Sequence, residues 1–313
     1  MDLIAGERIR LIRDKALELG FDDIGFSPAG QLTDQESHFD RWIDNGFHAG
    51  MNYMANHRDL RLDPRLLVEG ANTVISLLTL YNPSQHPLHN DAPVIARYAY
   101  GEDYHDILRA KLQALFQFIR EHIYTELDGR VFVDSAPVLE RAWAQKAGLG
   151  WIGKNTHLIH PKLGSYTFIS ELIVNLPLHH DVAMVNDHCG GCTRCIDACP
   201  TAALTPHSLD ANRCISFLTI ENKGDIPDEF IGQFQNRVFG CDICQEVCPW
   251  NRKAPVTNES LLMPKPELMA LTKDDWYTLD ADRFRLLFKK SAVKRAKYEG
   301  LMRNLKFIQD QAP

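Results

Sequence analysis

The cysteines constrain this chain more than any other feature of its sequence. All eight lie between residues 189 and 248, and none occurs earlier. Disulfides rarely persist in a reducing compartment, so cysteines gathered in this way indicate metal binding. No run of about 18 to 20 apolar residues is present to span a membrane, and Asp2, Glu7 and Arg8 interrupt the place where a signal peptide needs an apolar core. We therefore expect a cytoplasmic protein without a membrane segment.

Four of the cysteines follow the spacing of bacterial ferredoxins. The run C-x2-C-x2-C-x3-C-P begins at Cys189 and ends at Pro200. In such a run one tight loop directs three thiolates at one cubane, and the fourth cysteine ligates the other cluster. The last three positions recur from Cys241 to Pro249, but Val238 occupies the first. Cys214 is the remaining cysteine and completes two sets of four.

The crossing rule of ferredoxins assigns these cysteines to two [4Fe–4S] clusters. The first set is Cys189, Cys192, Cys195 and Cys248, and the second is Cys199, Cys214, Cys241 and Cys244. Two structural zinc ions are the alternative, because zinc also binds C-x2-C pairs, but the linked C-x3-C-P endings argue against zinc. The cysteine-free part of the chain is much longer than the cysteine-rich part, so we expect the clusters to deliver electrons to a reaction.

Apolar spacing predicts a mixture of helices and strands before the cysteines. Helices are expected at residues 2–19, 104–127 and 137–147, strands at 21–26, 73–81 and 130–134, and a hairpin from 156–160 and 165–175. After a proline-containing linker, further helices are expected at 266–269, 280–290 and 291–304. We therefore expect an α+β fold in three parts: an α/β catalytic domain (1–180), a ferredoxin-like two-cluster domain (181–255) and a short helical segment (256–313).

Positive charge is concentrated near the end of the sequence. Residues 283–306 contain nine Lys or Arg and one acid, so this basic segment carries about +8 although the whole chain has a net charge of −7. Such a run is either a solvated helix face or a contact surface for a polyanion.

Two further features carry possible chemistry. The stretch GLGWIG (148–153) fits the G-x-G-x-x-G pattern of nucleotide-binding loops, but it follows a helix instead of a strand, so we read it as a false match. Asp134 is expected at the carboxyl end of a strand, where half-burial would raise its pKa and suit it to act as a general acid. The simpler alternative is that Asp134 or Ser135 caps the next helix.

Beyond these patterns, the sequence resembles the epoxyqueuosine reductase family over essentially its whole length. The motifs that carry the resemblance are RYAYGEDYH (97–105), VDSAPVLER (133–141), AGLGWIGKN (147–155), RCISFLTIE (213–221) and GCDICQEVCPWN (240–251). The resemblance implies an oxidoreductase of queuosine biosynthesis that processes tRNA. It also implies a cobalamin, bound without a histidine ligand to cobalt, and two [4Fe–4S] clusters.

The resemblance also implies roles for particular residues. Asp134 would be the proton donor above the cobalt, and residues 148–155 would form a corrin-binding loop whose glycines allow close backbone approach. Further cobalamin contacts are implied for Arg97, Lys154, Asn155 and Ser216. Members of the family commonly continue into a HEAT-like repeat, whereas this sequence ends at Pro313, so we expect part of the tRNA platform to be absent.

The implied reaction is reduction of the epoxide of epoxyqueuosine to an alkene at the wobble position of tRNA. The implied partners are a tRNA anticodon stem-loop, held by the basic segment, and an external electron donor such as flavodoxin or ferredoxin, with the protein acting as a monomer. Two other classes are considered. A corrinoid reductive dehalogenase acting on a small molecule would not need the basic segment, and a ferredoxin-like electron carrier would not bind a corrin.

Overall fold

The computed structural model describes residues 5–178 and 184–309. Its larger part is built on a four-stranded antiparallel sheet, in the order β1 (Asp23–Pro28), β2 (Thr73–Leu80), β7 (Thr167–Val174) and β4 (Gly129–Phe132). All eight residues of β2 are buried, because this strand lies inside the sheet and is covered on both faces. Within the described ranges, no helix has the length and apolar composition needed to cross a bilayer.

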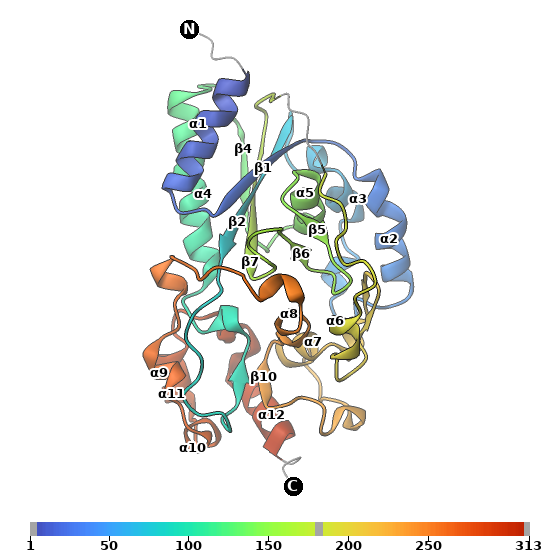
Figure 1. Cartoon of the computed structure of the whole chain (residues 1–313), viewed down its shortest axis with the longest axis vertical. Helices are drawn as coiled ribbons and strands as arrows, with labels where there is room; N and C mark the ends of the chain where they lie inside the picture. The colour runs from blue at the N-terminus through green and yellow to red at the C-terminus, as the bar shows by residue number, and fades with distance from the viewer. Residues whose placement is uncertain (1–4, 179–183, 310–313) are drawn as a thin grey trace.

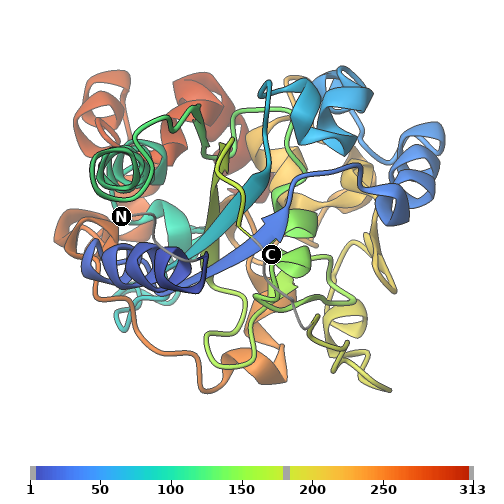
Figure 2. The same ribbon diagram turned by 90° about the horizontal axis from the view of Figure 1, so that it is seen from above.

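Helices cover both faces of this sheet (Figures 1 and 2). On one face, α1 (Ala5–Glu18) and α4 (Tyr104–His122) bury apolar side chains such as Ile12 and Leu112 against the sheet. On the other face lies α5 (Glu140–Lys146), whose Trp143 is fully buried against the sheet. The adjoining helices are α2 (Thr33–Asp44) and α3 (Arg58–Leu62). The α+β class is thus confirmed.

The predicted hairpin is only partly correct. Residues of β6 (Leu158–Ile159) pair with β5 (Trp151–Ile152), and a single bridge from His160 to Gly164 closes the turn toward β7. The reason is that β2 and β4 already occupy both edges of β7, so no edge remains for β6. The His160 ring closes the turn instead, by accepting hydrogen bonds from the backbone N–H groups of Lys162 and Leu163.

A second, smaller unit contains the cysteines and the C-terminal helices. Its regular elements are β3 (Val94–Ile95), α6 (Arg194–Asp197), β8 (Leu204–Thr205), β9 (Ser208–Leu209), α7 (Ile215–Ile220), β10 (Arg237–Phe239), α8 (Ile243–Glu246), α9 (Pro266–Met269), α10 (Lys273–Tyr277), α11 (Ala281–Leu287) and α12 (Lys297–Gln309). Short 3-10 turns also occur at Asn52–Met54, Pro64–Leu66, Arg97–Ala99, Ala211–Arg213, Asp228–Phe230, Pro249–Asn251, Ser260–Leu262 and Ala292–Ala296. Strand β10 pairs in parallel with β3, which comes from the first hundred residues.

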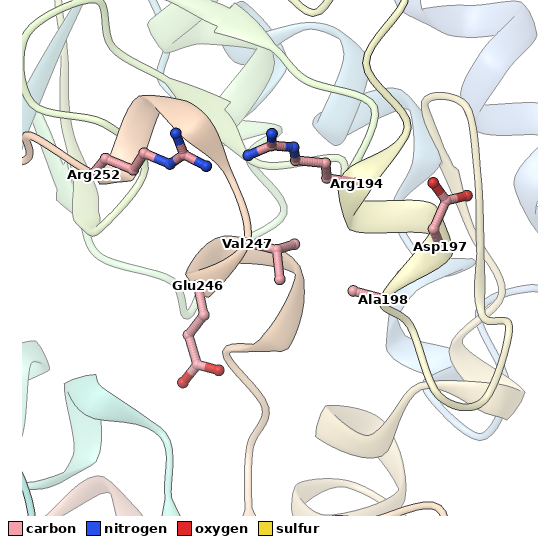
Figure 3. A pocket seen from close by; sticks show the side chains of 6 residues that line it. All are labelled: Arg194, Asp197, Ala198, Glu246, Val247 and Arg252. Carbon is pink, nitrogen blue, oxygen red and sulfur yellow. The ribbon is translucent and has the colours of Figure 1, made fainter.

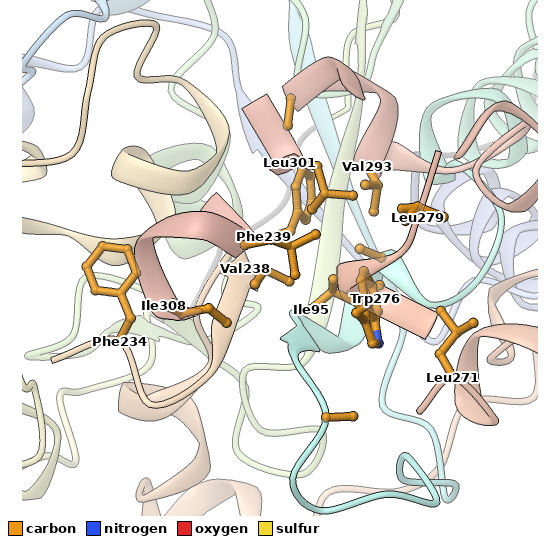
Figure 4. Packing of buried hydrophobic residues seen from close by; sticks show 14 of the residues in the cluster. Ile95, Phe234, Val238, Phe239, Leu271, Trp276, Leu279, Val293, Leu301 and Ile308 are labelled. Carbon is orange, nitrogen blue, oxygen red and sulfur yellow. The ribbon is translucent and has the colours of Figure 1, made fainter. Parts of the chain in front are cut away.

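One hydrophobic core joins most of these elements (Figure 4). Ile95 of β3, Phe239 of β10, Trp276 of α10 and Leu301 of α12 all belong to it. The core therefore draws residues from all three predicted parts of the chain. The boundaries at residues 180 and 255 stay predictions.

The predicted helix at 291–304 is divided in two. A 3-10 helix, Ala292–Ala296, precedes α12, and the chain turns at Lys297, whose φ is +58°. Ser291 is buried and its hydroxyl donates to the carbonyl of Ala99, so the start of this segment is fixed to the core instead of extending a helix. Helical spacing alone does not reveal such a tertiary constraint.

Candidate active site and cluster ligands

Asp134 lies in a short loop between β4 and α5. Its backbone has a φ of +52°, a left-handed conformation that is strained for a residue with a side chain. The backbone N–H of Asp134 donates to Oε1 of Glu140 at 2.7 Å, which holds the loop in this conformation. The N-cap of α5 is Leu139, without a side-chain cap. The capping role considered for Asp134 or Ser135 is therefore wrong.

The first turn of α4 supplies two partners for the Asp134 carboxylate. The hydroxyl of Tyr104 donates to Oδ2 of Asp134 at 2.6 Å, and Nε2 of His105 lies 3.7 Å from the same oxygen. Asp103 caps the helix through the N–H of His105 and also bonds Nδ1 of that ring at 2.7 Å. The Tyr104 ring stacks between His105 and Phe168, so its hydroxyl is held in place.

These contacts fix which groups carry protons. Burial raises the pKa of Asp134, but its interactions with His105 and Tyr104 outweigh this effect, so the pKa lies below the usual value. The carboxylates of Asp103 and Asp134 raise the pKa of His105 to about 9. Burial and the charge of Asp134 raise the pKa of Glu140 to about 8. The expectation of a raised pKa at Asp134 is therefore wrong, and the protons at neutral pH reside on His105 and Glu140.

The basic segment reaches this acid. Arg295 forms an ion pair with Glu221, and its positive charge lowers the pKa of Asp134. The same pair flanks Tyr53, an exposed residue of the 3-10 turn at Asn52–Met54. The surroundings of Asp134 thus combine an aromatic side chain with positive charge, as sites for nucleic acid do. Sequence patterns do not identify Tyr104, His105 and Glu140 as partners of Asp134, although all three lie in the motifs that carry the family resemblance.

None of the eight cysteines forms a disulfide. Burial raises the pKa of Cys248, and Cys189 and Cys192 raise it further. Burial likewise raises the pKa of Cys244, followed by the effects of Cys241 and Cys214. Cys195, which belongs to the other predicted set, also raises the pKa of Cys244, so the division into two sets stays a prediction. Within the described residues, no three Cys, His, Asp or Glu side chains converge on a point that would hold a single metal ion.

The four other predicted cofactor residues lie against the cysteine motifs. The backbone N–H of Arg97 donates to Asp242 at 2.7 Å, and the ammonium of Lys154 donates to the carbonyls of Gly190 and Cys192. The side-chain amide of Asn155 donates to the carbonyl of Cys244, and the backbone N–H of Ser216 bonds the Cys214 thiol. These residues therefore come together at the cysteines.

The glycines of the predicted corrin-binding loop have a local structural role. A Cβ at Gly150, where φ is +156°, would lie 2.2 Å from the carbonyl oxygen of Ile159. At Gly153 a Cβ would lie 2.5 Å from the Ile159 side chain. Gly150 is required by the close packing of β5 on β6, whereas a Cβ at Gly153 would displace only the end of the Ile159 side chain. Approach of the loop to a corrin stays a prediction.

Known proteins resemble the chain over its full length. Residues 188–251 match the "4Fe-4S double cluster binding domain" family, and residues 61–135 match "Epoxyqueuosine reductase QueG, DUF1730". The epoxyqueuosine reductase of Leadbetterella byssophila is 50% identical over 299 residues, which cover 96% of this chain and 97% of that protein.

Solved structures extend these comparisons. A selenomethionine-labelled epoxyqueuosine reductase superimposes with a TM-score of 0.91 at 30% identity, covering 98% of this chain and 82% of that one. An epoxyqueuosine reductase with a tRNA-Tyr epoxyqueuosine-modified stem loop gives a TM-score of 0.88, with the same identity and coverage. A reductive dehalogenase shares the fold alone, with a TM-score of 0.51 at 16% identity over 94% of this chain and 37% of its own.

The double-cluster segment is joined to a sheet domain that is much larger than the binding of two clusters requires. That domain holds an acid, Asp134, just after strand β4. This combination defines an iron–sulfur oxidoreductase and not a simple electron carrier. The sequence identity over nearly the whole length of both proteins makes the class specific: the chain belongs to the epoxyqueuosine reductase family.

Proposed function

We propose that this chain reduces epoxyqueuosine to queuosine at the wobble position of tRNA, with cobalamin and two [4Fe–4S] clusters as cofactors. The epoxide becomes an alkene and its oxygen leaves as water, so two electrons and two protons are consumed. The family identity and the stem-loop complex of a relative support this substrate. The likeness to a dehalogenase concerns the fold alone, so no observation favours small-molecule dehalogenation.

The donor set fits a corrin, whose rim carries amide groups. Lys154 and Asn155 place donors beside the cysteine motifs, and Arg97 uses one guanidinium nitrogen on Asn82 and keeps others for a ligand. When cobalamin is bound, these three residues, together with Ser216 and Asp134, would hold it. When bound, cobalamin supplies a low-valent metal centre able to reduce a carbon–oxygen bond.

Asp134 delivers a proton to the departing epoxide oxygen. Its own pKa is low, so the proton comes from a neighbour that is charged at neutral pH. His105 is that neighbour, with Nε2 facing Oδ2 of Asp134, and Tyr104 keeps the carboxylate oriented. This arrangement is the observation that carries the proposal. A Bacillus subtilis epoxyqueuosine reductase, with a TM-score of 0.87 and 30% identity over 98% of this chain and 82% of that one, was solved with an aspartate "catalytic loop swung out of the active site".

Electrons reach the site one at a time through the clusters. We assign Cys189, Cys192, Cys195 and Cys248 to one cluster and Cys199, Cys214, Cys241 and Cys244 to the other. An external donor such as flavodoxin or ferredoxin supplies the electrons, and the basic segment holds the anticodon stem-loop. We expect the protein to act as a cytoplasmic monomer.

The test is Asp134→Asn, compared with the wild type. Asn has nearly the same size, so tRNA affinity, cobalamin content and melting temperature should be retained. Turnover should fall by about 10²-fold or more, the usual effect of losing a general acid. A folded, cofactor-loaded variant that turns over at the normal rate would show that the proton comes from elsewhere.

A further inference from the structure

An open pocket lies between the two short helices that carry the cysteine motifs (Figure 3). Its volume is about 490 Å³. It is lined by Arg194, Asp197 and Ala198 of α6 and its end, and by Glu246, Val247 and Arg252 of α8 and the following turn. None of these residues has a role in the reaction proposed above.

The acids that line this pocket are bonded to other residues, whereas, within the described part of the chain, the side chains of its two arginines are not. The guanidinium groups of Arg194 and Arg252 point toward one another across the pocket in Figure 3. The acids are engaged elsewhere, because Glu246 accepts a hydrogen bond from Arg237 at 2.8 Å and Asp197 accepts one from Thr193 at 2.7 Å. Among the residues that the structure describes, no hydrogen bond or ion pair joins either Arg194 or Arg252 to another side chain.

Two exposed guanidinium groups that face each other without an acid between them favour a carboxylate or phosphate from outside. Arginine binds such groups through two parallel hydrogen bonds, and a pair of arginines neutralises the charge of an acidic surface patch. The pocket therefore has the chemistry of a contact for an anionic partner.

The position of the pocket beside the cysteine motifs indicates which kind of anionic partner it would bind. Arg194 directly precedes Cys195, and Arg252 follows Cys248 by four residues. Helix α6 contains Cys195 and α8 contains Cys244, so the two helices that line the pocket carry cysteines from both predicted sets. Electron transfer slows steeply with distance, so a donor must bind where it approaches a cluster. The RNA-facing charge, by contrast, lies in the basic segment beside Asp134.

We propose that this pocket is the docking surface for an acidic one-electron donor protein, whose surface carboxylates bind between Arg194 and Arg252. The inference rests on the proposed function for the existence of such a donor. Redox encounters bury little surface and depend on complementary charge, so a small pocket with two arginines suits a transient complex. Because such a complex depends on charge, the rate of electron delivery should depend strongly on ionic strength.

The experiment compares two reductants on the reconstituted full chain. Bleaching of the cluster absorbance is followed after mixing with reduced flavodoxin, a strongly acidic donor, or with dithionite. In the double variant Arg194→Glu/Arg252→Glu, the flavodoxin rate at low salt should fall about tenfold or more, and the dithionite rate should be unchanged. Because cluster bleaching needs no tRNA, this readout stands even if the proposed substrate is wrong.

Controls separate the alternatives. Arg109→Glu/Arg120→Glu makes the same charge change on the exposed face of α4 and should leave both rates unchanged. An unaltered rate of cluster bleaching by flavodoxin in Arg194→Glu/Arg252→Glu would overturn the proposal. If this variant also lost tRNA binding while that rate stayed normal, the pocket would be an RNA contact instead. If the variant loses iron, the proposal is tested on the wild type instead. The rate of cluster bleaching by flavodoxin should then fall at least tenfold as the salt concentration is raised. A rate that does not depend on salt would overturn the proposal.

Discussion

Asp134 and Glu140 are neighbouring acids that the fold drives to opposite protonation states. Asp134 is stabilised as an anion by Tyr104 and His105, whereas Glu140 stays protonated near neutral pH. Acids whose pKa values are pushed apart by their surroundings are typical of catalytic sites. Glu140 also holds the strained loop through the backbone of Asp134. It is thus a positioning residue for the acid.

This arrangement predicts a pH-dependent stability that resides in Glu140. A carboxyl whose pKa is raised to about 8 on folding binds more protons in the folded than in the unfolded state. The free energy of unfolding therefore decreases as the pH rises from about 4.5 to about 8. Glu140→Gln keeps an oxygen acceptor for the loop and cannot ionise. We expect the variant to lose less stability than the wild type in thermal melts between pH 6 and 9.

The size of the effect can be measured as a change in melting temperature. In a chain of this length a difference of about 1 kcal/mol shifts it by about 1.5 °C. Glu140→Ala, which removes the acceptor, should release the loop and lower turnover at every pH. Parallel melting curves for the wild type and Glu140→Gln across this range would contradict a buried, protonated Glu140.

At the scale of elements, some cationic side chains of the basic segment bond to other parts of the protein, and others are exposed to solvent. Arg303 donates to the backbone carbonyls of Leu218, Asn222 and Gly224, so it fastens α12 to α7 and the turn after it. Arg283 pairs with Asp275. Lysines 289, 294 and 297 are exposed. The lysines are therefore the better candidates for binding phosphate.

We expect the triple variant Lys289→Gln/Lys294→Gln/Lys297→Gln to bind the anticodon stem-loop more weakly than the wild type. Each lysine that neutralises a phosphate contributes about 0.7 to 0.9 to the slope of log K against log salt, so the slope of the variant should be smaller by about 2 to 3. Binding is measured by titration across a salt series. The matched control Arg10→Gln/Arg109→Gln/Arg120→Gln removes three charges from α1 and α4. Equal slopes for the two variants would mean that the basic segment is only a solvated helix face.

Sequence patterns predicted the elements whose cause is local. The buried strand at 73–80 and the long amphipathic α4 match their predictions closely, because periodicity and burial coincide there. The 3-10 helix before α12 and the start of α5 at Glu140 were missed. A distant contact, from Ser291 to Ala99, fixes the first, and a side-chain contact from Glu140 to the backbone of Asp134 accompanies the second. In the same way, cysteine spacing predicted two sets of ligands, but no pattern could show that α4 brings Tyr104 and His105 to Asp134.

At the scale of the whole molecule, the cysteine motifs and the sheet are joined by buried polar contacts. The side-chain amide of Gln245 donates to the backbone carbonyl of Ser165 and to the hydroxyl of Tyr81. Asn251 bonds the Ser165 hydroxyl as well. The strand ends of the sheet and the second cysteine motif therefore share one hydrogen-bond network.

The cluster assignment predicts the iron content of the chain and of one variant. After anaerobic reconstitution the wild type should hold about eight iron and eight sulfide per chain, as two cubanes require. Cys214→Ser removes one ligand of the second cluster and should reduce the iron to about four on desalting. About eight iron atoms retained in the variant would show that Cys214 is not a ligand.

We propose that this chain removes the oxygen of epoxyqueuosine in tRNA with the help of cobalamin. The most direct measurement is mass spectrometry of nucleosides from epoxyqueuosine-containing tRNA after incubation with the reconstituted, reduced protein. We expect a product lighter by one oxygen atom in the presence of cobalamin and unchanged substrate when cobalamin is omitted. Unchanged epoxyqueuosine with both clusters and cobalamin bound, or full conversion without cobalamin, would contradict it.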